Sequence, residues 1–245
     1  MSHQLPYEVL AENIPIGQIT SVKQKSTFNY FGHVNAPIAL EVARFLATKT
    51  DACEEEILAT VQTFVQTTQN DCIGNAFEKS ACWLTIRVTK PADDFLLPRW
   101  HQDGRMFPYD EGREEVVRSK YALTLLGPHT LMLPTTLRNV EVLLAGEKKH
   151  YWWWNDPVAP STEEEWDQAH DMLRQWLADQ FRGDERVHID NGQVVRFSWG
   201  RNDSAIHSEP DLVSDRVFMT ILYGSEAELH RMCEWRGEEY GRFDW

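Results

Sequence analysis

The sequence has few cysteines, no surplus of positive charge and no long hydrophobic run. Its four cysteines, among 245 residues, show no C-x-x-C spacing, which is typical of a cytoplasmic chain with reduced, mostly structural thiols. Acidic residues outnumber basic ones by 38 to 24, which gives a formal net charge of −14. Binding to nucleic acid depends on clustered Lys and Arg side chains. Because no such cluster is present, we expect no nucleic-acid partner.

Other absences narrow the function further. No apolar run approaches the length that spans a membrane, and the first residues, Met1–Pro6, lack the charged and apolar regions of a secretory signal. The sequence also contains no G-x-S-x-G motif, no phosphate-binding loop and no dinucleotide-binding fingerprint. We therefore expect a cytoplasmic protein without a membrane partner.

The spacing of apolar residues indicates a single α+β domain. Asn35 can cap a first helix, and a second helix is expected from about residue 51 to residue 69. The expected parts of the chain are a helical N-terminal part (about 1–75), a β core (about 81–225) with a helical insert (near 161–182), and a tail (226–245). Helices gathered ahead of many short strands favour a β-sandwich or barrel with the N-terminal helices packed on it.

Several segments have the two-residue period of a strand. In Ala81–Thr89 the side chains of Leu84, Ile86 and Val88 share one face. Further strands are expected at Tyr121–Leu126, Val194–Trp199 and Arg216–Tyr223.

His101-Gln102-Asp103 and the distant His207 form the strongest functional signal. Residues two apart on a strand point to the same side, so His101 and Asp103 would reach into one cavity. His207, in a short segment before Pro210, would arrive from a second strand across that cavity. Two imidazoles and one carboxylate on one face of a metal leave its opposite face open for substrate and gas. For the H-x-D motif alone, an ordinary surface pair is the alternative interpretation.

Arg216 begins an apolar strand in which Arg216, Phe218 and Thr220 share one face. A guanidinium that points inward from a strand requires an anion, because an unpaired buried charge is costly. That anion is either a neighbouring carboxylate side chain or the carboxylate of a ligand.

The order of H-x-D, distal His and following Arg resembles the pattern of the Fe(II)/2-oxoglutarate-dependent oxygenases. The matching motifs lie between His101 and Thr220. The resemblance implies a double-stranded β-helix core (jelly-roll, cupin-like), with Fe(II) bound at a catalytic centre formed by His101, Asp103 and His207. It also implies that Arg216 binds the far carboxylate of 2-oxoglutarate, a bidentate task that suits a guanidinium.

One position departs from that family's pattern. Many relatives have a Ser two residues after the Arg, where this chain has Phe218. Tyr121, Thr124 and Thr220 are the candidates for a hydroxyl that assists Arg216 in its place.

The resemblance implies a dioxygenase that consumes O2, converts 2-oxoglutarate to succinate and hydroxylates a small organic molecule. The carboxylate at Asp103 disfavours halogenation, since related halogenases have a small residue there. Arg87, Trp100 and Trp153 are candidate substrate contacts, although a structural partner would also account for Arg87. Two other functions remain open on the same scaffold, because function resides in the site rather than the fold. They are a non-catalytic metal- or carboxylate-binding sensor and a cupin-like metalloenzyme that uses no 2-oxoglutarate.

A second H-x-D motif, His188-Ile189-Asp190, is the alternative ligand pair. It runs directly into Asn191-Gly192, a strong signal for a hairpin turn. We therefore expect Asp190 to belong to the turn rather than to a metal site.

Overall fold

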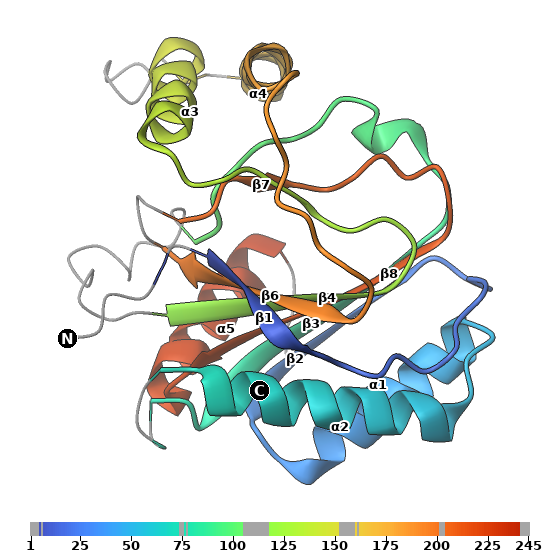
Figure 1. Ribbon diagram of the computed structural model, residues 1–245. Coiled ribbons are helices and arrows are strands. Elements are labelled where there is room, and N and C mark those ends of the chain that lie inside the picture. Colours follow the sequence, from blue (N-terminus) through green and yellow to red (C-terminus); the bar gives the residue numbers. More distant parts are fainter. Residues whose placement is uncertain are drawn as a thin grey trace.

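A computed structural model describes residues 5, 7–73, 76, 78–104, 118–151, 160, 162–200 and 204–240 (Figure 1). An antiparallel sheet of six strands, the main sheet, crosses the molecule in the order β1-β6-β4-β8-β3-β2. Its strands are β1 (Tyr7–Asn13), β2 (Ser26–His33), β3 (Ala81–Thr89), β4 (Arg118–Leu126), β6 (Gln193–Trp199) and β8 (Arg216–Gly224). The predicted strands at β3, β4, β6 and β8 are thus confirmed.

A second, smaller sheet faces the main one. Its strands are β5 (Leu131–Met132) and β7 (His207–Ser208). An isolated bridge joins His101 to His207 on one side, and the Val187 amide donates to the Met132 carbonyl at 2.9 Å on the other. We call β5, β7 and these two flanking segments the small sheet.

From β3 onward the chain alternates between the two sheets. It runs from β3 through the His101 segment to β4, then through β5 and the Val187 segment to β6, and finally through β7 to β8. The architecture is therefore α+β with mostly antiparallel sheet, and it is compatible with a β-sandwich.

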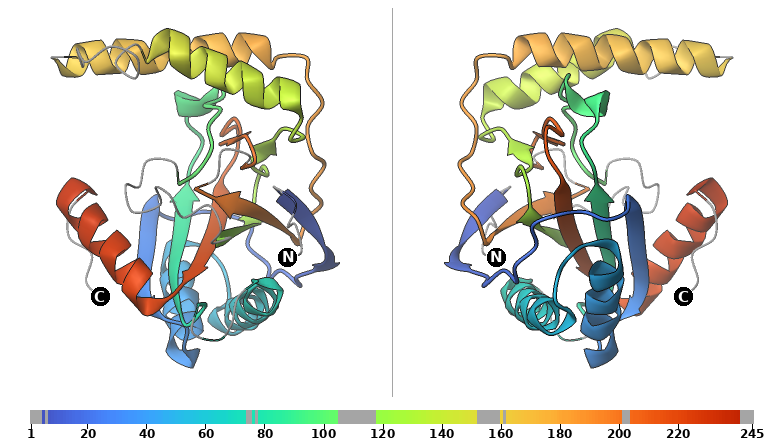
Figure 2. Two further views of the ribbon diagram at one scale, coloured as in Figure 1. Left: turned by 90° about the vertical axis from the view of Figure 1, so that its left-hand side faces the viewer. Right: turned by 90° about the vertical axis from the view of Figure 1, so that its right-hand side faces the viewer.

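Helices α1 (Ala36–Lys49) and α2 (Glu54–Asp71) cover the face of the main sheet that points away from the small sheet (Figures 1 and 2). The Asn35 side chain caps α1 by accepting a hydrogen bond from the Ile38 amide at 3.3 Å, as its sequence position predicts. The fully buried Leu84, Ile86 and Val88 pack beneath these helices. We call this side of the sheet the helix face and the opposite side the inner face.

In the part of the chain that the structure describes, three further helices lie on the side of the main sheet that its inner face points to. Helices α3 (Leu137–His150) and α4 (Glu163–Gln180) form an outer layer above the small sheet (Figure 2). Helix α5 (Glu226–Tyr240) packs Leu229 and Met232 against Trp83 on the inner face of β3. A short 3-10 turn, η1 (Asp93–Phe95), precedes the His101 segment. Among the described residues, no helix combines the length and apolar character needed to cross a membrane.

Two secondary-structure expectations need correction. The N-terminal part is not simply helical, because β1 and β2 precede α1 and form the two edges of the main sheet. Both strands have polar faces, and their partners β6 and β3 lie far along the chain, so local periodicity gives little sign of them. Helix α3 was also not expected. The tail does contain a helix, α5, and the predicted helical insert is α4.

Candidate metal centre

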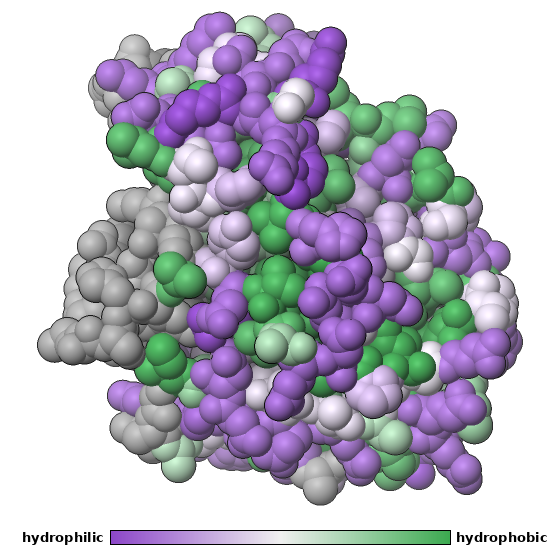
Figure 3. Space-filling view, in the orientation of Figure 1, coloured by the Kyte–Doolittle hydropathy of each residue, from purple (hydrophilic) through white to green (hydrophobic). Residues whose placement is uncertain are grey.

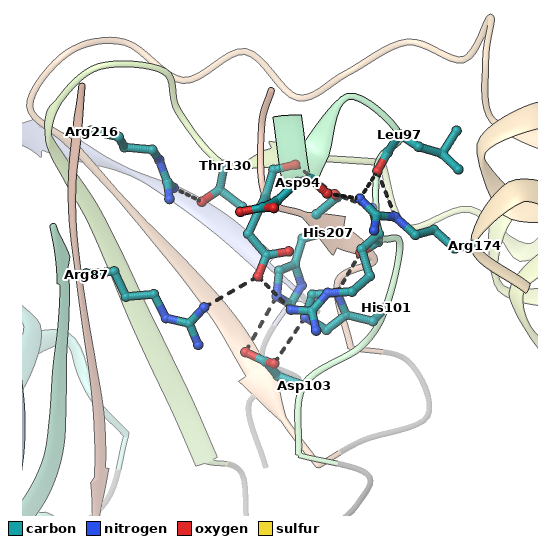
Figure 4. A network of polar contacts seen from close by, with 12 residues as sticks. Arg87, Asp94, Leu97, His101, Asp103, Thr130, Arg174, His207 and Arg216 are labelled. Atoms are coloured by element: carbon teal, nitrogen blue, oxygen red, sulfur yellow. Dashed lines mark hydrogen bonds and ion pairs between the residues drawn. The ribbon is translucent and has the colours of Figure 1, made fainter. Parts of the chain in front are cut away.

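His101, Asp103 and His207 lie together between the two sheets (Figure 4). One ligand atom from each lies within 4.8 Å of the others. The His101 Nε2 atom is 3.5 Å from Asp103 Oδ1, and the His207 Nε2 atom is 3.5 Å from Asp103 Oδ2. Paired backbone hydrogen bonds of 3.0 Å between His101 and His207 fix the two strands in this register. The antiparallel bridge thus brings together residues that are far apart in sequence.

The hydrogen bonds of both imidazoles leave Nε2 free to bind a metal. His101 Nδ1 lies 2.8 Å from the Arg99 carbonyl oxygen, and His207 Nδ1 lies 3.0 Å from the Ala205 carbonyl oxygen. A carbonyl can only accept, so each Nδ1 must carry the proton and donate it. A neutral imidazole whose Nδ1 donates has its lone pair on Nε2, and Nε2 is the atom that faces Asp103 in both residues. This is how proteins orient histidine ligands of metals.

Asp103 completes a donor set of two nitrogens and one oxygen. Burial opposes ionisation of its carboxyl, but Lys120 and the two histidines hold the pKa of Asp103 well below its usual range. The Lys120 ammonium donates to Asp103 Oδ2 at 2.5 Å. A carboxylate that stays ionised beside two imidazoles fits Fe(II), the ion for which this ligand set is best known.

The turn after Asp103 requires glycine. Gly104 has a φ of +88°, and a Cβ atom there would lie 2.5 Å from the Gly200 nitrogen and 2.8 Å from the Trp199 ring. The Gly200 amide donates to the Asp103 carbonyl at 3.0 Å. These contacts hold the backbone of Asp103 against the end of β6, because no side chain separates the two segments.

Arg216 lies on the same inner face, 3% exposed, at the start of β8. Its Nε donates to the Pro128 carbonyl at 2.9 Å, its Nη2 to Thr130 Oγ1 at 3.1 Å, and it stacks 4.2 Å above the Phe218 ring. Burial lowers the pKa of this guanidinium to about 10. No carboxylate among the described residues is within ion-pair distance of it. Of the two anions that the sequence left open, a neighbouring carboxylate side chain is therefore not found among the residues that the structure describes.

A small cavity is lined by side chains that contact Arg216 and by one that contacts His207. Thr130 and Phe218 line it beside Arg216, and Phe197 lines it beside His207, with the Phe197 and His207 ring centroids 4.9 Å apart. Its volume is about 10 Å³, which is room for about one water molecule. A ligand that reached from the metal ligands to Arg216 would need the Phe218 ring to move.

Three more charged side chains border the site. Glu209 Oε1 lies 2.6 Å from Arg99 Nη2 and 3.8 Å from Arg87 Nη1, and both arginines are about half exposed. Burial would raise the pKa of Glu209, but His101 and Arg99 lower it to about 2. Two guanidiniums thus share one carboxylate beside His101.

The structure brings only some of the predicted residues to the site. Thr124 lines the cavity, and Thr220 lies on the inner face without a hydrogen bond to Arg216. Tyr121 points instead to the helix face, where its hydroxyl donates to Asp71 at 2.9 Å. It is therefore not placed to assist Arg216, because alternate residues of a strand face opposite sides.

The proposed substrate contacts also differ in position. Arg87 borders the site. Trp100 is buried beneath α3 and α4, against Phe181 at 5.8 Å between ring centroids, so it is not placed to touch a substrate. Trp153 lies outside the described residues. His188 and Asp190 form an exposed pair at 2.9 Å, as expected for a turn.

Lys120, Thr130 and Glu209 are site residues that sequence reasoning did not find. A Lys within a strand usually indicates a solvent-facing position, so Lys120 gave no signal. Thr130 lies in a short expected strand, His129–Leu133, where nothing local marks it as a contact of Arg216. Glu209 is two residues after His207, and the two-residue period could have placed both on one side.

A larger groove, of about 1030 Å³, lies elsewhere, between residues 93–97 and α4. Carboxylates dominate its lining, including Asp93, Asp167 and Asp171, and the surface over α3 and α4 is mainly hydrophilic (Figure 3). Arg174 joins its two walls by donating to the carbonyls of Asp94 and Leu97 (Figure 4). None of the three candidate metal ligands lines this groove.

No protein-family profile matches the chain, and no curated protein matches it in sequence. Among solved structures, the non-heme iron oxygenase OrfP is distantly similar, with a TM-score of 0.31 and 16% sequence identity. The similarity covers 74% of this chain and 67% of that one. A likeness this weak establishes neither fold nor activity, so the function is inferred from the site itself.

Proposed function

We propose that this protein is an Fe(II)- and 2-oxoglutarate-dependent oxygenase that oxidises a small organic molecule. The observation that carries the proposal is one arrangement of four residues. His101 and His207 turn their Nε2 atoms towards Asp103, while each Nδ1 is hydrogen-bonded to a backbone carbonyl. Beside a small cavity, the buried Arg216 has no carboxylate within ion-pair distance in the part of the chain that the structure describes. The alternation of the chain between two sheets supports a double-stranded β-helix, the fold that carries such a site in these oxygenases.

Each residue has a distinct part in this function. Bound Fe(II) would supply the reaction of O2 with 2-oxoglutarate, which yields succinate and CO2 and leaves one oxygen atom for the substrate. His101, Asp103 and His207 would hold the ion from one side. Arg216 and Thr130 would bind the far carboxylate of 2-oxoglutarate by charge-assisted hydrogen bonds.

The surrounding apolar side chains would exclude water from the cavity, and Phe197 would restrict the orientation of His207 by ring contact. Arg87 is the proposed substrate contact, because its side chain is 52% exposed beside the site. Its distance to Glu209, 3.8 Å, is long for an ion pair, so its guanidinium can also bind a ligand. A guanidinium in that position suits a substrate with an anionic group.

A cupin-like metalloenzyme that uses no 2-oxoglutarate is the second candidate. The cavity of about 10 Å³ favours it, since Phe218 occupies space that a dicarboxylate would need. In that case Arg216 would serve only to hold the Pro128 and Thr130 segment against β8. A non-catalytic sensor would bind the same ligands without consuming 2-oxoglutarate.

The deciding experiment is an anaerobic titration with Fe(II) and then 2-oxoglutarate, followed by the visible metal-to-ligand charge-transfer band. We expect a band in the wild type, none in His207→Ala, and a band that needs at least about tenfold more 2-oxoglutarate in Arg216→Gln. Arg138→Gln is the matched control, because Arg138 is an exposed guanidinium in α3 that contacts Asp184.

Iron binding without a band would reject 2-oxoglutarate and favour the cupin-like enzyme. A band without succinate formation across a substrate panel would favour the sensor. If no iron binds, the metal assignment is wrong.

A further inference from the structure

Lys120 occupies an unusual position for a lysine. It lies on the inner face of β4, with its side chain 14% exposed, and its ammonium donates to Asp103 Oδ2 at 2.5 Å. Its neighbours across the sheet are Phe197 on β6 and Leu222 on β8. The ammonium therefore contacts Oδ2 of Asp103, the carboxylate oxygen that also faces His207.

Three aromatic rings surround this ammonium. Its Nζ atom lies 5.1 Å from the Trp199 ring centroid, 5.6 Å from that of Phe197 and 5.9 Å from that of Trp83. Helix α5 packs against Trp83 and Trp199 and covers them. Ring faces attract a cation, and the low-dielectric surroundings strengthen its effect on nearby charges.

A simple counter-ion role does not account well for this arrangement. Without a metal, Lys120 neutralises Asp103. With a divalent ion bound, the same carboxylate is already compensated, and the ammonium becomes an additional positive charge beside the ion. Such a charge opposes metal binding. A site arranged only for tight binding would place a neutral donor there.

The extra charge has a direct chemical consequence. A cation hydrogen-bonded to a ligand carboxylate withdraws electron density from the ligand, and polar contacts of this kind tune bound metals. It destabilises a trivalent ion more than a divalent one, because repulsion grows with the charge of the ion. Fe(II) would therefore be favoured over Fe(III).

We propose that Lys120 is a positioning and tuning residue that keeps the bound iron ferrous, at the cost of weaker binding of divalent ions. The iron part of this proposal rests on the proposed function. The affinity part does not, because it holds for any divalent ion at the three ligands.

Two measurements that do not involve catalytic activity test it. The first is the affinity for Zn(II), which has no redox chemistry, and the second is the Fe(III)/Fe(II) reduction potential. For Lys120→Met we expect Zn(II) to bind at least tenfold more tightly. We also expect the potential to fall by about 59 mV or more, which is a tenfold change in the ferric-to-ferrous ratio for one electron.

Three comparison variants separate charge from shape. Lys149→Met is the matched control, because Lys149 also lies over a tryptophan, Trp176, at 5.7 Å but belongs to α3. It should change neither quantity. Lys120→Arg keeps the charge and should stay near the wild type. Lys120→Gln keeps a donor without the charge, should follow Lys120→Met, and serves in its place if the methionine variant does not fold.

Unchanged or weaker Zn(II) binding in both neutral variants would overturn the proposal and leave Lys120 as a support for Asp103. An unchanged potential would also overturn it. If the wild type binds Zn(II) but not iron, the proposed function fails, and the Zn(II) affinities alone decide the role of Lys120. If the wild type binds neither ion, both proposals fail.

Discussion

On β4, Tyr121, Leu123 and Leu125 point towards α1 and α2, whereas Lys120 and Thr124 point towards the small sheet. The helix face of the main sheet is mostly apolar, and its buried polar groups are paired. The Tyr121 hydroxyl donates to Asp71, and the buried Arg196 pairs with Asp71 and Glu8. The inner face instead carries the Lys120–Asp103 ion pair and Arg216, which has no carboxylate within ion-pair distance among the described residues.

The two faces of the same strands therefore serve different purposes, the stability of the fold and the binding of a ligand. Side chains on the helix face bury apolar surface and stabilise the fold. On the inner face, Arg216 is a buried charge with no carboxylate partner in the described part of the chain, and such a charge costs stability unless a ligand compensates it. Because the two sets alternate residue by residue, substitutions one position apart should have different consequences.

The largest expected effect is on metal binding. His207→Ala removes one of three ligands, so affinity for divalent ions should fall more than about 100-fold, because replacing residues that merely support ligands already costs roughly 10- to 100-fold. The thermal unfolding midpoint of the metal-free protein should change little. Calorimetric titration with Zn(II) measures the affinity. Retained affinity would mean that His207 is not a ligand.

Leu123→Ala should have the converse effect. Leu123 is fully buried on the helix face, so its truncation should lower the free energy of unfolding by about 2–5 kcal/mol. The affinity of the folded molecules for Zn(II) should be unchanged. Urea denaturation measures the first quantity. A loss of affinity at full folding would show that the two faces are coupled.

Glu209 should make stability depend on acid pH. Its pKa is about 2 in the folded protein against an ordinary value of 4.5, so its contribution is complete above about pH 4.5 and is lost as pH falls towards 2. Over that window the metal-free wild type should lose on the order of 2 kcal/mol more than Glu209→Gln. Denaturant unfolding at several pH values tests this. If the free energy of unfolding falls equally with pH in the wild type and in Glu209→Gln, the prediction is wrong.

The smallest effect compares two hydroxyls. Thr130→Val removes the hydroxyl that accepts from Arg216 and should weaken 2-oxoglutarate binding by about 1 kcal/mol, or roughly fivefold. Tyr121→Phe should leave that binding unchanged and lower only stability. The 2-oxoglutarate dependence of the charge-transfer band measures both. Equal effects on binding would show that contact of the hydroxyl with Arg216 is not what matters.

Sequence reasoning found those parts of the molecule whose signals are local. Alternation identified β3, β4, β6 and β8, because each buries one face under helices. Spacing and period also selected His101, Asp103 and His207, which the structure brings together. The partner of Arg216 was different, since Thr130 lies beside it only because the end of β4 pairs with the start of β8, where Leu126 opposes Val217.

Lys120 was missed for a related reason. Its environment consists of Trp83, Phe197 and Trp199, which come from other parts of the chain. Nothing adjacent to Lys120 in the sequence distinguishes it from an exposed lysine. The same holds for β1 and β2, whose partners are distant strands. Signals that depend on tertiary contact are thus absent from local patterns.

The bridge between His101 and His207 also has a kinetic consequence. It closes a long stretch of chain, and contacts between distant residues form late in folding because loop closure must come first. A metal ion finds its ligands assembled only in a nearly native chain. Bound metal should therefore slow unfolding and leave the rate of refolding unchanged. The ion would stabilise the native state without taking part in the folding nucleus.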